Sequence, residues 1–347
     1  MSPKPIRKQD VARACGVNVT TVTLALNNHP RVAERTRLRI QAEASRLGYL
    51  ANHAALQLVK SRFGRTRQGM DRIGFVLLGP QEPLRGAYTA FMVGIEQEVS
   101  AHGGTLLFVR ETPARPRPRF VELARSGAVD GLALVGAVDE PALLQAQRTG
   151  LPFVVLGDHH GTTPVHQVTA DFPAMGRLAV RHLVEQGHRR IGFLGATMQY
   201  VYQREIRDGA KAALAEAGLP VGETWVRSHG VDDDVITPLH RMLALRPRPT
   251  ALILGEPNVA AHLLDLLKAC GLKVPADISL ATCEESDSQP VMAGVTYVDA
   301  SMAAVGTAGA ALLREVAGES GGPARRVLTA PRLVEGGSVR KQKETAR

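Results

Sequence analysis

The sequence predicts a small all-α helix-turn-helix head followed by an α/β core of two doubly wound parallel-sheet lobes. Residues 10–27, DVARACGVNVTTVTLALN, have the apolar spacing of two short helices joined by a tight turn. From residue 72 onward, short apolar runs alternate with helical segments, the pattern of parallel strands covered on both faces. The run RIGF at 72–75 recurs at 190–193, and the order of elements after each copy matches. This repeat predicts two similar lobes with a ligand-binding cleft between them.

The first helix and the turn are specified by local residues. Val11, Ala12 and Ala14 are expected to form the apolar face of the helix. Gly16 stands where the chain must reverse without a Cβ, and Asn18 is a favourable N-cap for the helix that follows.

The second helix has one apolar face and one polar face. Val22 and Leu26 are four residues apart and are expected to pack against the first helix. The side chains expected to project outward are those of Val19, Thr20, Thr21, Thr23 and Leu24. This layout is typical of a DNA-reading helix-turn-helix, whose second helix enters the major groove. An ordinary helical hairpin at the edge of a domain is the alternative.

The positive charge of the chain is concentrated at its start. The 347 residues include 42 Lys and Arg and 33 Asp and Glu, a net charge of +9. Residues 1–72 hold 14 of the basic and 4 of the acidic residues, so the remainder is close to neutral. A basic module on a neutral body favours phosphate binding. A solvated basic tail is the alternative, but these arginines alternate with helix-forming apolar residues: Arg31, Arg35, Arg37 and Arg39.

Composition narrows the class of protein. At this length, with 44% hydrophobic residues, two or three domains with cores of their own are expected. The N-terminus has no apolar signal region and no run is long enough to span a bilayer, so a cytoplasmic protein is expected. Cys15, Cys270 and Cys283 lack metal-ligand spacing and are expected to be thiols in a reducing compartment.

The remaining elements follow from periodicity. A third helix is expected over 34–47, with Leu38, Ala42 and Ser45 on its apolar face and Gly48 at its end. Residues 61–71 are polar and basic and are expected to form a linker. The expected core strands are 72–79, 105–110, 131–136, 152–158, 190–196, 251–255 and 278–282. Helices are expected over 90–102, 120–126 and 141–149 and around Gly209.

Residues 7–340 resemble the lactose-repressor (LacI/GalR) family of transcriptional regulators. The resemblance rests on residues 10–27, on RTRLRIQAEASRLGYLANHAALQL at 35–58, on GHRRIGFLG at 187–195 and on GLKVPADISL at 271–280. It implies a helix-turn-helix domain, a hinge helix and a two-lobed core like periplasmic binding proteins.

The resemblance also implies the boundaries of these parts. The DNA-binding domain would span 1–50, the hinge helix and linker 51–71, and the effector-binding and dimerisation core 72–340. Lobe 1 would take 72–164 and 297–323, and lobe 2 would take 165–293 and 324–340. The chain would cross between lobes at 161–167, 293–297 and 321–326.

The family's DNA contacts carry over to named positions. Val19, Thr20 and Leu24 fall where relatives present side chains to base edges. The positions that contact phosphates are Asn18, Thr21, Thr23, Asn27 and Arg31, whose short polar or basic groups suit phosphate oxygens. Many members carry an arginine where Leu24 stands, and leucine favours a thymine methyl over guanine.

The hinge is the second DNA element that the resemblance implies. Asn52, Ala55 and Leu58 match the segment that folds into the minor groove, and Leu58 would be the wedge that opens a base step. Ala51 replaces the proline usual before this asparagine. The alternative is that the segment only extends the linker.

The expected effector cleft departs from the family pattern. Ile206 stands where sugar-binding members usually have an arginine, and Glu256 and Pro257 replace an Asn-Asp pair. Glu284 begins a Glu pair where an Asp pair is common. The other candidate effector contacts are Tyr88, Asp158 and Arg204. The prediction is an apolar or cationic effector, or none, rather than a neutral sugar; a two-residue slip of the alignment is the alternative.

Other constellations are weaker. His188 is expected to be structural rather than a catalytic base. His159, His160 and His166 have no carboxylate or thiolate at matching spacing, so solvated loops are expected rather than a metal site. Residues 232–234, DDD, are expected to form a turn or cap rather than a Mg²⁺ cluster.

Three functions compete on these observations. A solute-binding protein would explain only the core and would need an export signal, which the sequence lacks. A Rossmann-type enzyme would need a phosphate-binding glycine loop or a catalytic constellation, and neither is found. The sequence therefore predicts a non-enzymatic, DNA-binding regulator without metal or cofactor. We expect a homodimeric repressor on a palindromic double-stranded operator, with a small-molecule effector.

Overall fold

The computed structural model divides the chain into two units, residues 1–67 and 68–347, and each is described by itself. The residues that it describes are 8–26, 29, 31–47, 70–79, 86–111, 118–159, 161–195, 201–222, 225–228, 235–255, 260–284, 294–319 and 322–342.

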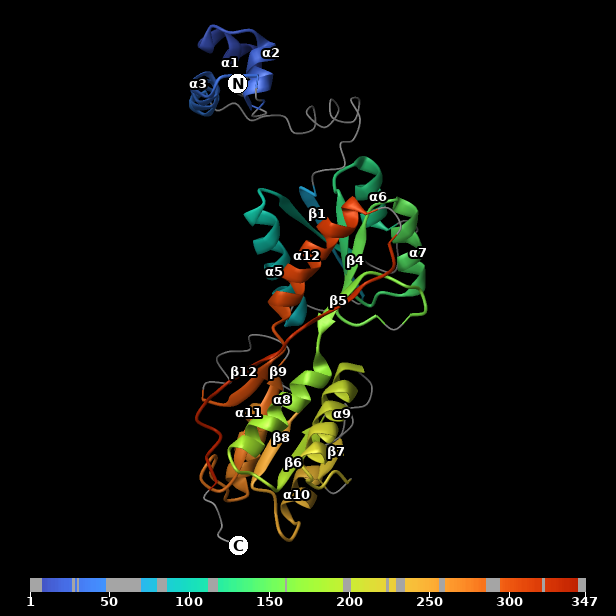
Figure 1. Cartoon of the computed structure of the whole chain (residues 1–347), viewed down its shortest axis with the longest axis vertical. Coiled ribbons are helices and arrows are strands. Elements are labelled where there is room, and N and C mark those ends of the chain that lie inside the picture. Colours follow the sequence, from blue (N-terminus) through green and yellow to red (C-terminus); the bar gives the residue numbers. More distant parts are fainter. Residues whose placement is uncertain are drawn as a thin grey trace. The chain divides into compact units, whose positions relative to one another are not determined.

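The first unit is a three-helix head (Figure 1). Its helices are α1 (Lys8–Cys15), α2 (Val19–Leu26) and α3 (Glu34–Arg46). Gly16 has a φ of +62°, and Val17 N–H donates to the Ala12 carbonyl at 3.0 Å, so the predicted tight turn is confirmed. The fully buried side chains of Val11 and Val22 join the first two helices, and Leu26 is half-buried against them, as predicted.

Two details of the head differ from the prediction. Ala14 is exposed, and the half-buried Cys15, four residues after Val11, lies against the core instead. On α3, Leu38 is 57% exposed and Ala42 is exposed, and the side chain of Ser45 lies outside the described residues. The buried stripe of α3 consists of Ile40, Ala44 and the half-buried Leu47. Ile40 stands about 200° around the helix from Leu38, so the predicted face was on the wrong side.

The first lobe is built on a six-stranded parallel sheet. Its strands lie in the order β11-β5-β4-β3-β1-β2, and every described pair is parallel. The strands are β1 (Arg72–Leu78), β2 (Thr105–Glu111), β3 (Gly131–Gly136), β4 (Phe153–Leu156), β5 (Gln167–Ala170) and β11 (Arg326–Thr329). The helices are α5 (Ala87–Ala101), α6 (Arg119–Ser126), α7 (Glu140–Thr149) and α12 (Met302–Gly318).

The second lobe repeats this plan. Its sheet order is β12-β10-β9-β8-β6-β7, the same succession with each strand replaced by its counterpart. The strands are β6 (Ile191–Gly195), β7 (Val226–Ser228), β8 (Ala251–Leu254), β9 (Ser279–Glu284), β10 (Thr296–Asp299) and β12 (Arg332–Val334). The helices are α8 (Phe172–Glu185), α9 (Val201–Glu216), α10 (Ile236–Leu243) and α11 (Ala260–Ala269). Among the described strand pairs of this sheet, β12 with β10 is the antiparallel one. Two doubly wound lobes, as the RIGF repeat predicted, are therefore confirmed.

A close helix pair lies in each lobe, α5 with α12 and α8 with α9. A Cβ added to Gly94 would overlap the Ala303 carbonyl oxygen, and one added to Gly209 would overlap the Pro173 carbonyl oxygen. These two glycines occupy equivalent places after the RIGF runs. Their helices approach each other backbone to backbone, which only glycine allows.

The crossings between lobes lie later in the chain than predicted. β5 ends at Ala170 in the first sheet, and α8 then packs on the second. The second crossing runs through Ala300 and Ser301, between β10 and α12, and the third runs through 330–331, between β11 and β12. The crossings were predicted at 161–167, 293–297 and 321–326. Each of these ranges is followed by a strand, β5, β10 or β11, that still pairs with the sheet of the lobe that the chain has not yet left. Each of these strands is short and partly polar, so its apolar content does not reveal its sheet.

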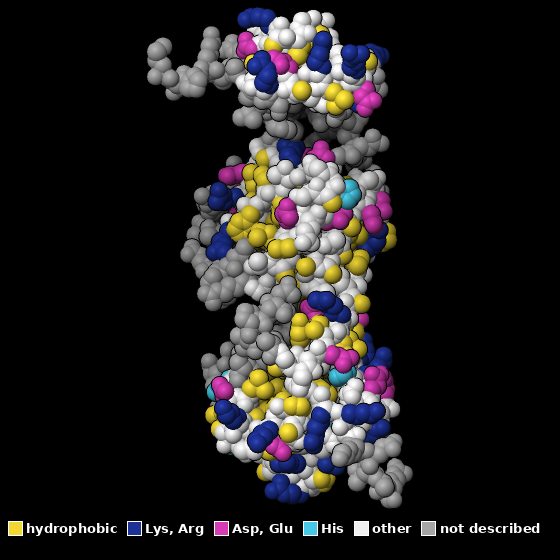
Figure 2. All heavy atoms as spheres, turned by 90° about the vertical axis from the view of Figure 1, so that its left-hand side faces the viewer, with side chains coloured by type: hydrophobic (Ala, Val, Ile, Leu, Met, Phe, Trp, Pro, Cys, Tyr) yellow, Lys and Arg dark blue, Asp and Glu magenta, His cyan; other side chains and the backbone are white. Residues whose placement is uncertain are grey.

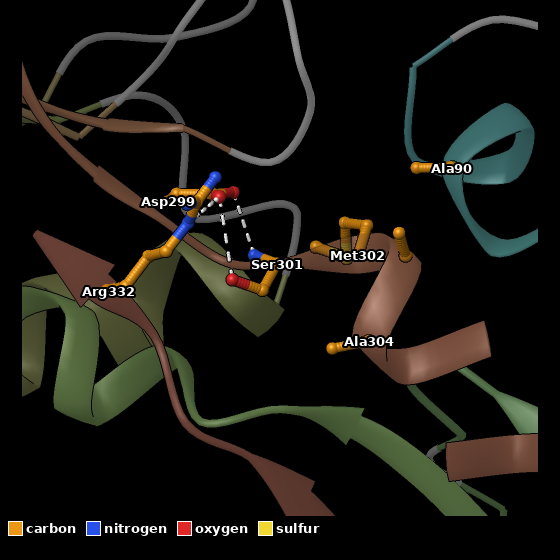
Figure 3. A pocket seen from close by; sticks show the side chains of 7 residues that line it. Ala90, Asp299, Ser301, Met302, Ala304 and Arg332 are labelled. Atoms are coloured by element: carbon orange, nitrogen blue, oxygen red, sulfur yellow. Dashed lines mark hydrogen bonds and ion pairs between the residues drawn. The ribbon is translucent and has the colours of Figure 1, made fainter. Parts of the chain in front are cut away.

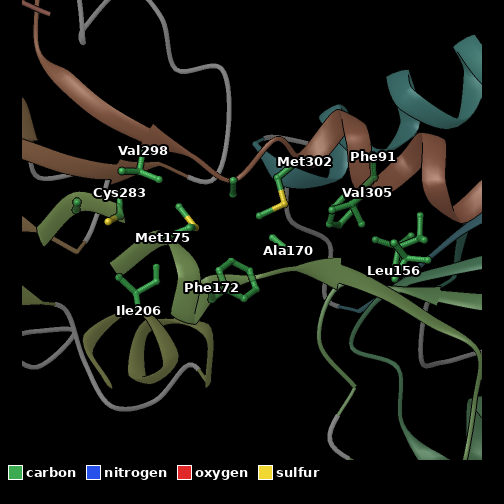
Figure 4. Close-up of a cluster of buried hydrophobic side chains, with 14 of the residues drawn as sticks. Phe91, Leu156, Ala170, Phe172, Met175, Ile206, Cys283, Val298, Met302 and Val305 are labelled. Carbon is green, nitrogen blue, oxygen red and sulfur yellow. The ribbon is translucent and has the colours of Figure 1, made fainter. Parts of the chain in front are cut away.

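One hydrophobic cluster runs through the crossings and joins the lobes. Figure 4 shows Val305 and Leu156 in the first lobe and Phe172 in the second, with Met302 and Ala170 between them. All five side chains belong to the same buried cluster. Met302 is 4% exposed and Phe172 is 4% exposed. The lobes are thus connected by packed side chains as well as by the three crossing segments.

Candidate functional site

The start of α2 is fixed by its N-cap. Asn18 Oδ1 accepts hydrogen bonds from the Thr21 N–H at 2.7 Å and the Thr21 hydroxyl at 2.8 Å. The cap satisfies a backbone donor that the first turn would otherwise leave unpaired. Val19 is 39% exposed and Thr20 is exposed, so these two side chains face solvent from a rigid helix start.

Other residues of α2 are less accessible than predicted. Leu24 is half-buried and packs against the core of the head. Thr21 and Thr23 are also half-buried. The Thr23 hydroxyl donates to the Val19 carbonyl at 3.0 Å, so its proton is already used within the helix. The structure therefore corrects the expectation that all five side chains project outward.

The basic residues of the head divide into two groups. Arg46 is held by Glu43 at 2.6 Å, and Arg37 lies 3.8 Å from Glu34. Within the described part of the head, the exposed arginines outside such ion pairs are Arg13, Arg31, Arg35 and Arg39. Lys and Arg side chains are prominent on the head in Figure 2. Asn27 and the predicted hinge residues Asn52, Ala55 and Leu58 lie outside the described residues.

The predicted effector contacts are distributed over several elements of the core. Tyr88 lies on α5, with its ring 6.5 Å from that of Phe91, and is 37% exposed. Asp158 follows β4 and accepts a hydrogen bond from the Thr169 hydroxyl at 3.3 Å. Arg204 is half-buried in the first turns of α9. Glu256 lies outside the described residues, as does the side chain of Glu284 at the end of β9.

Ile206 is not available to a ligand. It is 1% exposed and belongs to the hydrophobic cluster shown in Figure 4. Its carbonyl oxygen lies where a Cβ on Gly176 of α8 would stand. The prediction that Ile206 lines the cleft is therefore wrong, because this face of α9 packs on α8.

Sequence reasoning missed a polar group at the second crossing. Asp299 is 5% exposed at the end of β10, and its carboxylate accepts from the Ser301 N–H and from Arg332 Nε, both at 2.8 Å (Figure 3). A cavity of about 140 Å³ adjoins these residues and the start of α12. No motif marks them, because Asp299 and Arg332 are 33 residues apart and meet only through the pairing of β10 with β12.

The histidines do not form a metal centre in the described part of the chain, where no group of three possible ligands occurs. His188 is fully buried between Thr250, at 2.9 Å, and the Arg340 carbonyl, at 3.1 Å. Burial lowers the pKa of His188 to about 4, so the ring is neutral at pH 7. Its role is structural, as predicted, because it ties the C-terminal segment to the second lobe.

His159 differs from the solvated loop that was predicted. Its two ring nitrogens are buried and have no hydrogen-bond partner among the described residues. Nearby, Glu140 accepts bonds from the N–H and hydroxyl of Thr163, and these bonds hold the pKa of the Glu140 carboxyl below its ordinary value.

Two family models match the chain. One, described as bacterial regulatory proteins of the lacI family, matches residues 9–52, and the other, a periplasmic binding protein-like domain, matches residues 180–339. The chain is 26% identical to the HTH-type transcriptional repressor PurR of Photobacterium profundum, over 81% of this chain and 83% of that protein. It is 25% identical to catabolite control protein A of Priestia megaterium, over 78% and 80% of the two chains.

Solved structures share the fold. The lac repressor dimer bound to operator and the anti-inducer ONPF has a TM-score of 0.68 at 22% identity, covering 97% of this chain and 100% of that one. The complex of the transcriptional regulator CelR with cellobiose has a TM-score of 0.61 at 24% identity, covering 96% and 99%. Among the described residues, no helix has the length and apolar character needed to cross a membrane. The capped helix-turn-helix, the paired lobes and these matches show that the chain carries a lacI-family DNA-binding domain ahead of a periplasmic binding protein-like core and is a DNA-binding transcriptional regulator.

Proposed function

We propose that this regulator binds a two-fold operator as a homodimer, represses transcription, and changes its operator affinity when a small molecule occupies the core. The observation that carries the proposal is the exposed start of α2, fixed by the Asn18 cap on a basic head. A relative named as a transcriptional repressor supports repression rather than activation. A solved relative bound to its operator as a dimer supports two chains per operator. Since operator DNA is the partner, the protein acts in the cytoplasm.

The side chains at the start of α2 are assigned to bases or to phosphates according to which of their polar groups are already hydrogen-bonded within the head. Val19 and Thr20 present methyl groups that suit a thymine methyl, and the Thr20 hydroxyl suits a base edge. The oxygen of the Asn18 amide is used by the cap, which leaves its NH₂ group for a phosphate oxygen. Arg31 is exposed and supplies a second phosphate contact. Leu24 adds an apolar contact at the rim of this surface.

The remaining DNA contacts follow the family pattern. Thr21 and Thr23 must turn their hydroxyl groups away from Asn18 and Val19 before they donate to a phosphate. Asn27 is assigned to the same phosphate surface. Asn52, Ala55 and Leu58 are assigned to the minor groove, with Leu58 as the wedge.

The dimer forms through the face that α5 and β2 present. β2 is the edge strand of the first sheet, and Phe108 on it is 46% exposed. Val93 on α5 is 43% exposed. Figure 2 views the core from the side of α5 and shows hydrophobic side chains gathered on the first lobe. A second copy would cover this apolar face and the open strand edge, both of which favour association.

The effector is apolar or cationic rather than a neutral sugar. Ile206 is buried in the core, so it does not bear on the ligand, and the ligand class rests on the other candidate side chains. Asp158 and Tyr88 supply a carboxylate and an aromatic ring, which together suit a cation. Glu256 and Glu284 would add carboxylates, and Arg204, two residues before Ile206, would add a guanidinium. A regulator that works without an effector is the second candidate.

One experiment tests the proposal as a whole. The full chain is titrated against labelled DNA from upstream of its own gene, and binding is followed by fluorescence anisotropy. We expect saturable binding of two chains per duplex, with an affinity that falls by a factor of about 10³–10⁵ between 50 and 200 mM salt. Binding that is weak and independent of DNA sequence would refute the proposal. A thermal-shift screen with amines, amino acids and hexoses then tests the effector: strong stabilisation by a simple hexose would refute the ligand class.

A further inference from the structure

The second crossing between lobes contains an unusual backbone conformation. Ser301 has a φ of +54° and is the single non-glycine residue with positive φ among the described residues. It stands immediately before α12, whose first turn begins at Met302. A side chain at positive φ is strained, so this conformation persists only if its surroundings hold it.

Asp299 supplies that restraint. Its Oδ1 accepts the Ser301 N–H at 2.8 Å and its Oδ2 lies 3.4 Å from the Ser301 hydroxyl. The carboxylate is 5% exposed as a residue, so these bonds are shielded from water. The short loop of Asp299, Ala300 and Ser301 therefore fixes the direction in which the chain leaves the second lobe and enters α12 of the first.

The same carboxylate also joins the third crossing. Arg332 is the first residue of β12, stands opposite Asp299 in the antiparallel pair, and donates from Nε to Oδ2 at 2.8 Å. Figure 3 shows both sets of bonds meeting at Asp299. One buried carboxylate thus holds a residue at the end of the second crossing and another just after the third.

The cavity beside this group gives the crossing room to move. Its volume is about 140 Å³, and Ala90 of α5 and Ala304 of α12 line it on the side of the first lobe. Most of the remaining crossing is tightly packed, with Ala300 and Met302 buried. Space next to a strained residue allows Ser301 to change conformation without displacing the core.

We propose that Asp299 is a latch that holds the two lobes in one relative arrangement by keeping Ser301 at positive φ and by pairing with Arg332. Breaking the latch lets Ser301 relax to negative φ, which redirects the start of α12 and allows a second arrangement of the lobes. The expected consequence for operator affinity rests on the proposed function. The arrangement of the lobes itself does not, and it is measured separately.

The lobes are followed by pulsed dipolar spectroscopy on the full chain. One nitroxide is attached at Arg125→Cys on α6, an exposed position of the first lobe, and the other at the native Cys270, which is exposed in the second. Cys15→Ser removes the thiol of the head, and Cys283 is buried. Labelled protein is diluted with unlabelled protein, so that distances within one chain dominate.

We expect one narrow distance distribution for the parent protein and, in Asp299→Ala, an additional second population of about one tenth of the chains or more. Asp299→Asn keeps an acceptor for the Ser301 N–H but loses the charge. Arg332→Gln loses the ion pair but keeps the hydrogen bond from the Ser301 N–H to Asp299. Both variants should show a second population smaller than that of Asp299→Ala. They keep the latch testable if Asp299→Ala does not fold. Ser301→Gly in the Asp299→Ala background should restore the parent distribution in part, because glycine adopts positive φ without strain.

The matched control is Arg325→Gln. It removes ion pairs of 3.0 Å to Glu315 and Glu319 that lie within the first lobe. We expect it to leave the distance distribution unchanged. The latch is refuted if the parent already shows two populations, if Asp299→Ala matches the parent, or if Arg325→Gln broadens the distribution as much as Arg332→Gln. Failure of the parent to bind DNA would refute the proposed function and leave this result standing.

Discussion

Replacing Gly306 with alanine tests how closely α12 packs on α5, the contact that positions α12 at the end of the second crossing. An added Cβ would overlap the Phe91 carbonyl oxygen and lie 2.9 Å from the Phe91 carbonyl carbon and 3.0 Å from the Ile95 nitrogen. Ordinary contacts of a Cβ are 3.4–4 Å. All three neighbours are backbone atoms, so no side chain can rotate away, and the helices must separate.

The expected loss of stability in Gly306→Ala follows from this geometry. Overpacking a core costs about 1–3 kcal/mol, and a clash with backbone on a close helix pair belongs at the upper end. We expect Gly306→Ala to lower the free energy of unfolding by about 3 kcal/mol and the melting temperature by about 6–12 °C. Urea denaturation followed by circular dichroism measures the first quantity, and calorimetry measures the second.

Gly318 provides a matched control at the end of the same helix. Among the described residues, no atom outside the neighbouring backbone of α12 lies within 4 Å of a Cβ added there, so Gly318→Ala should be neutral or slightly stabilising. If Gly306→Ala is as stable as Gly318→Ala, within about 0.5 kcal/mol, the helix pair is not packed as described. The α5–α12 contact would then not position the end of the second crossing.

Three further predictions concern the head, the hinge and pH. Asn18→Ala should destabilise the head by about 1 kcal/mol and weaken binding to all DNA sequences alike, whereas Asn18→Ser keeps the cap. Thermal unfolding measures the loss of stability, and fluorescence anisotropy measures the loss of DNA binding. Equal stability of the two variants would contradict the role of the cap. Leu58→Ala should weaken binding to the operator more than to random DNA, and normal bending of the operator in a gel-mobility assay would refute its assignment as a wedge. Burial lowers the pKa of His188 from 6.5 to about 4, so the unfolded chain binds more protons and stability falls as pH drops from about 6.5 to about 4. At pH 5 the free energy of unfolding lost through His188 is about 2 kcal/mol. The urea midpoint should therefore change less between pH 7.5 and pH 5 in His188→Gln than in the parent. An equal change in the two proteins would contradict this role of His188.

The parts predictable from sequence are those fixed by local chemistry. The positive φ of Gly16 and the cap at Asn18 depend on neighbouring residues, and both are as predicted. The central strands are continuous apolar runs because both faces of each sheet are covered. β1 and β6 occupy equivalent places in their sheets, which explains why the RIGF repeat revealed two lobes.

The parts that were missed depend on contacts between distant residues. β5, QVTA, and β10, TYVD, contain polar residues that are buried only because of their neighbours, so neither reads as a core strand. On α3 two stripes have helical spacing, and the one through Ile40 is buried because it meets α1 and α2. Ile206 was assigned by analogy to the cleft, but its orientation is set by the close approach of α8 at Gly176.

The central claim is that the exposed start of α2 reads DNA sequence. Selection of bound duplexes from a random pool, performed with the parent chain and with Thr20→Ala, tests this claim most directly. We predict that the parent enriches a two-fold motif and that Thr20→Ala changes the preferred base at one symmetric position in both half-sites, with the rest of the motif retained. Arg31→Ala should enrich the parent motif with weaker binding. Enrichment of no motif, or the same motif with the same base preference in Thr20→Ala, would contradict the account.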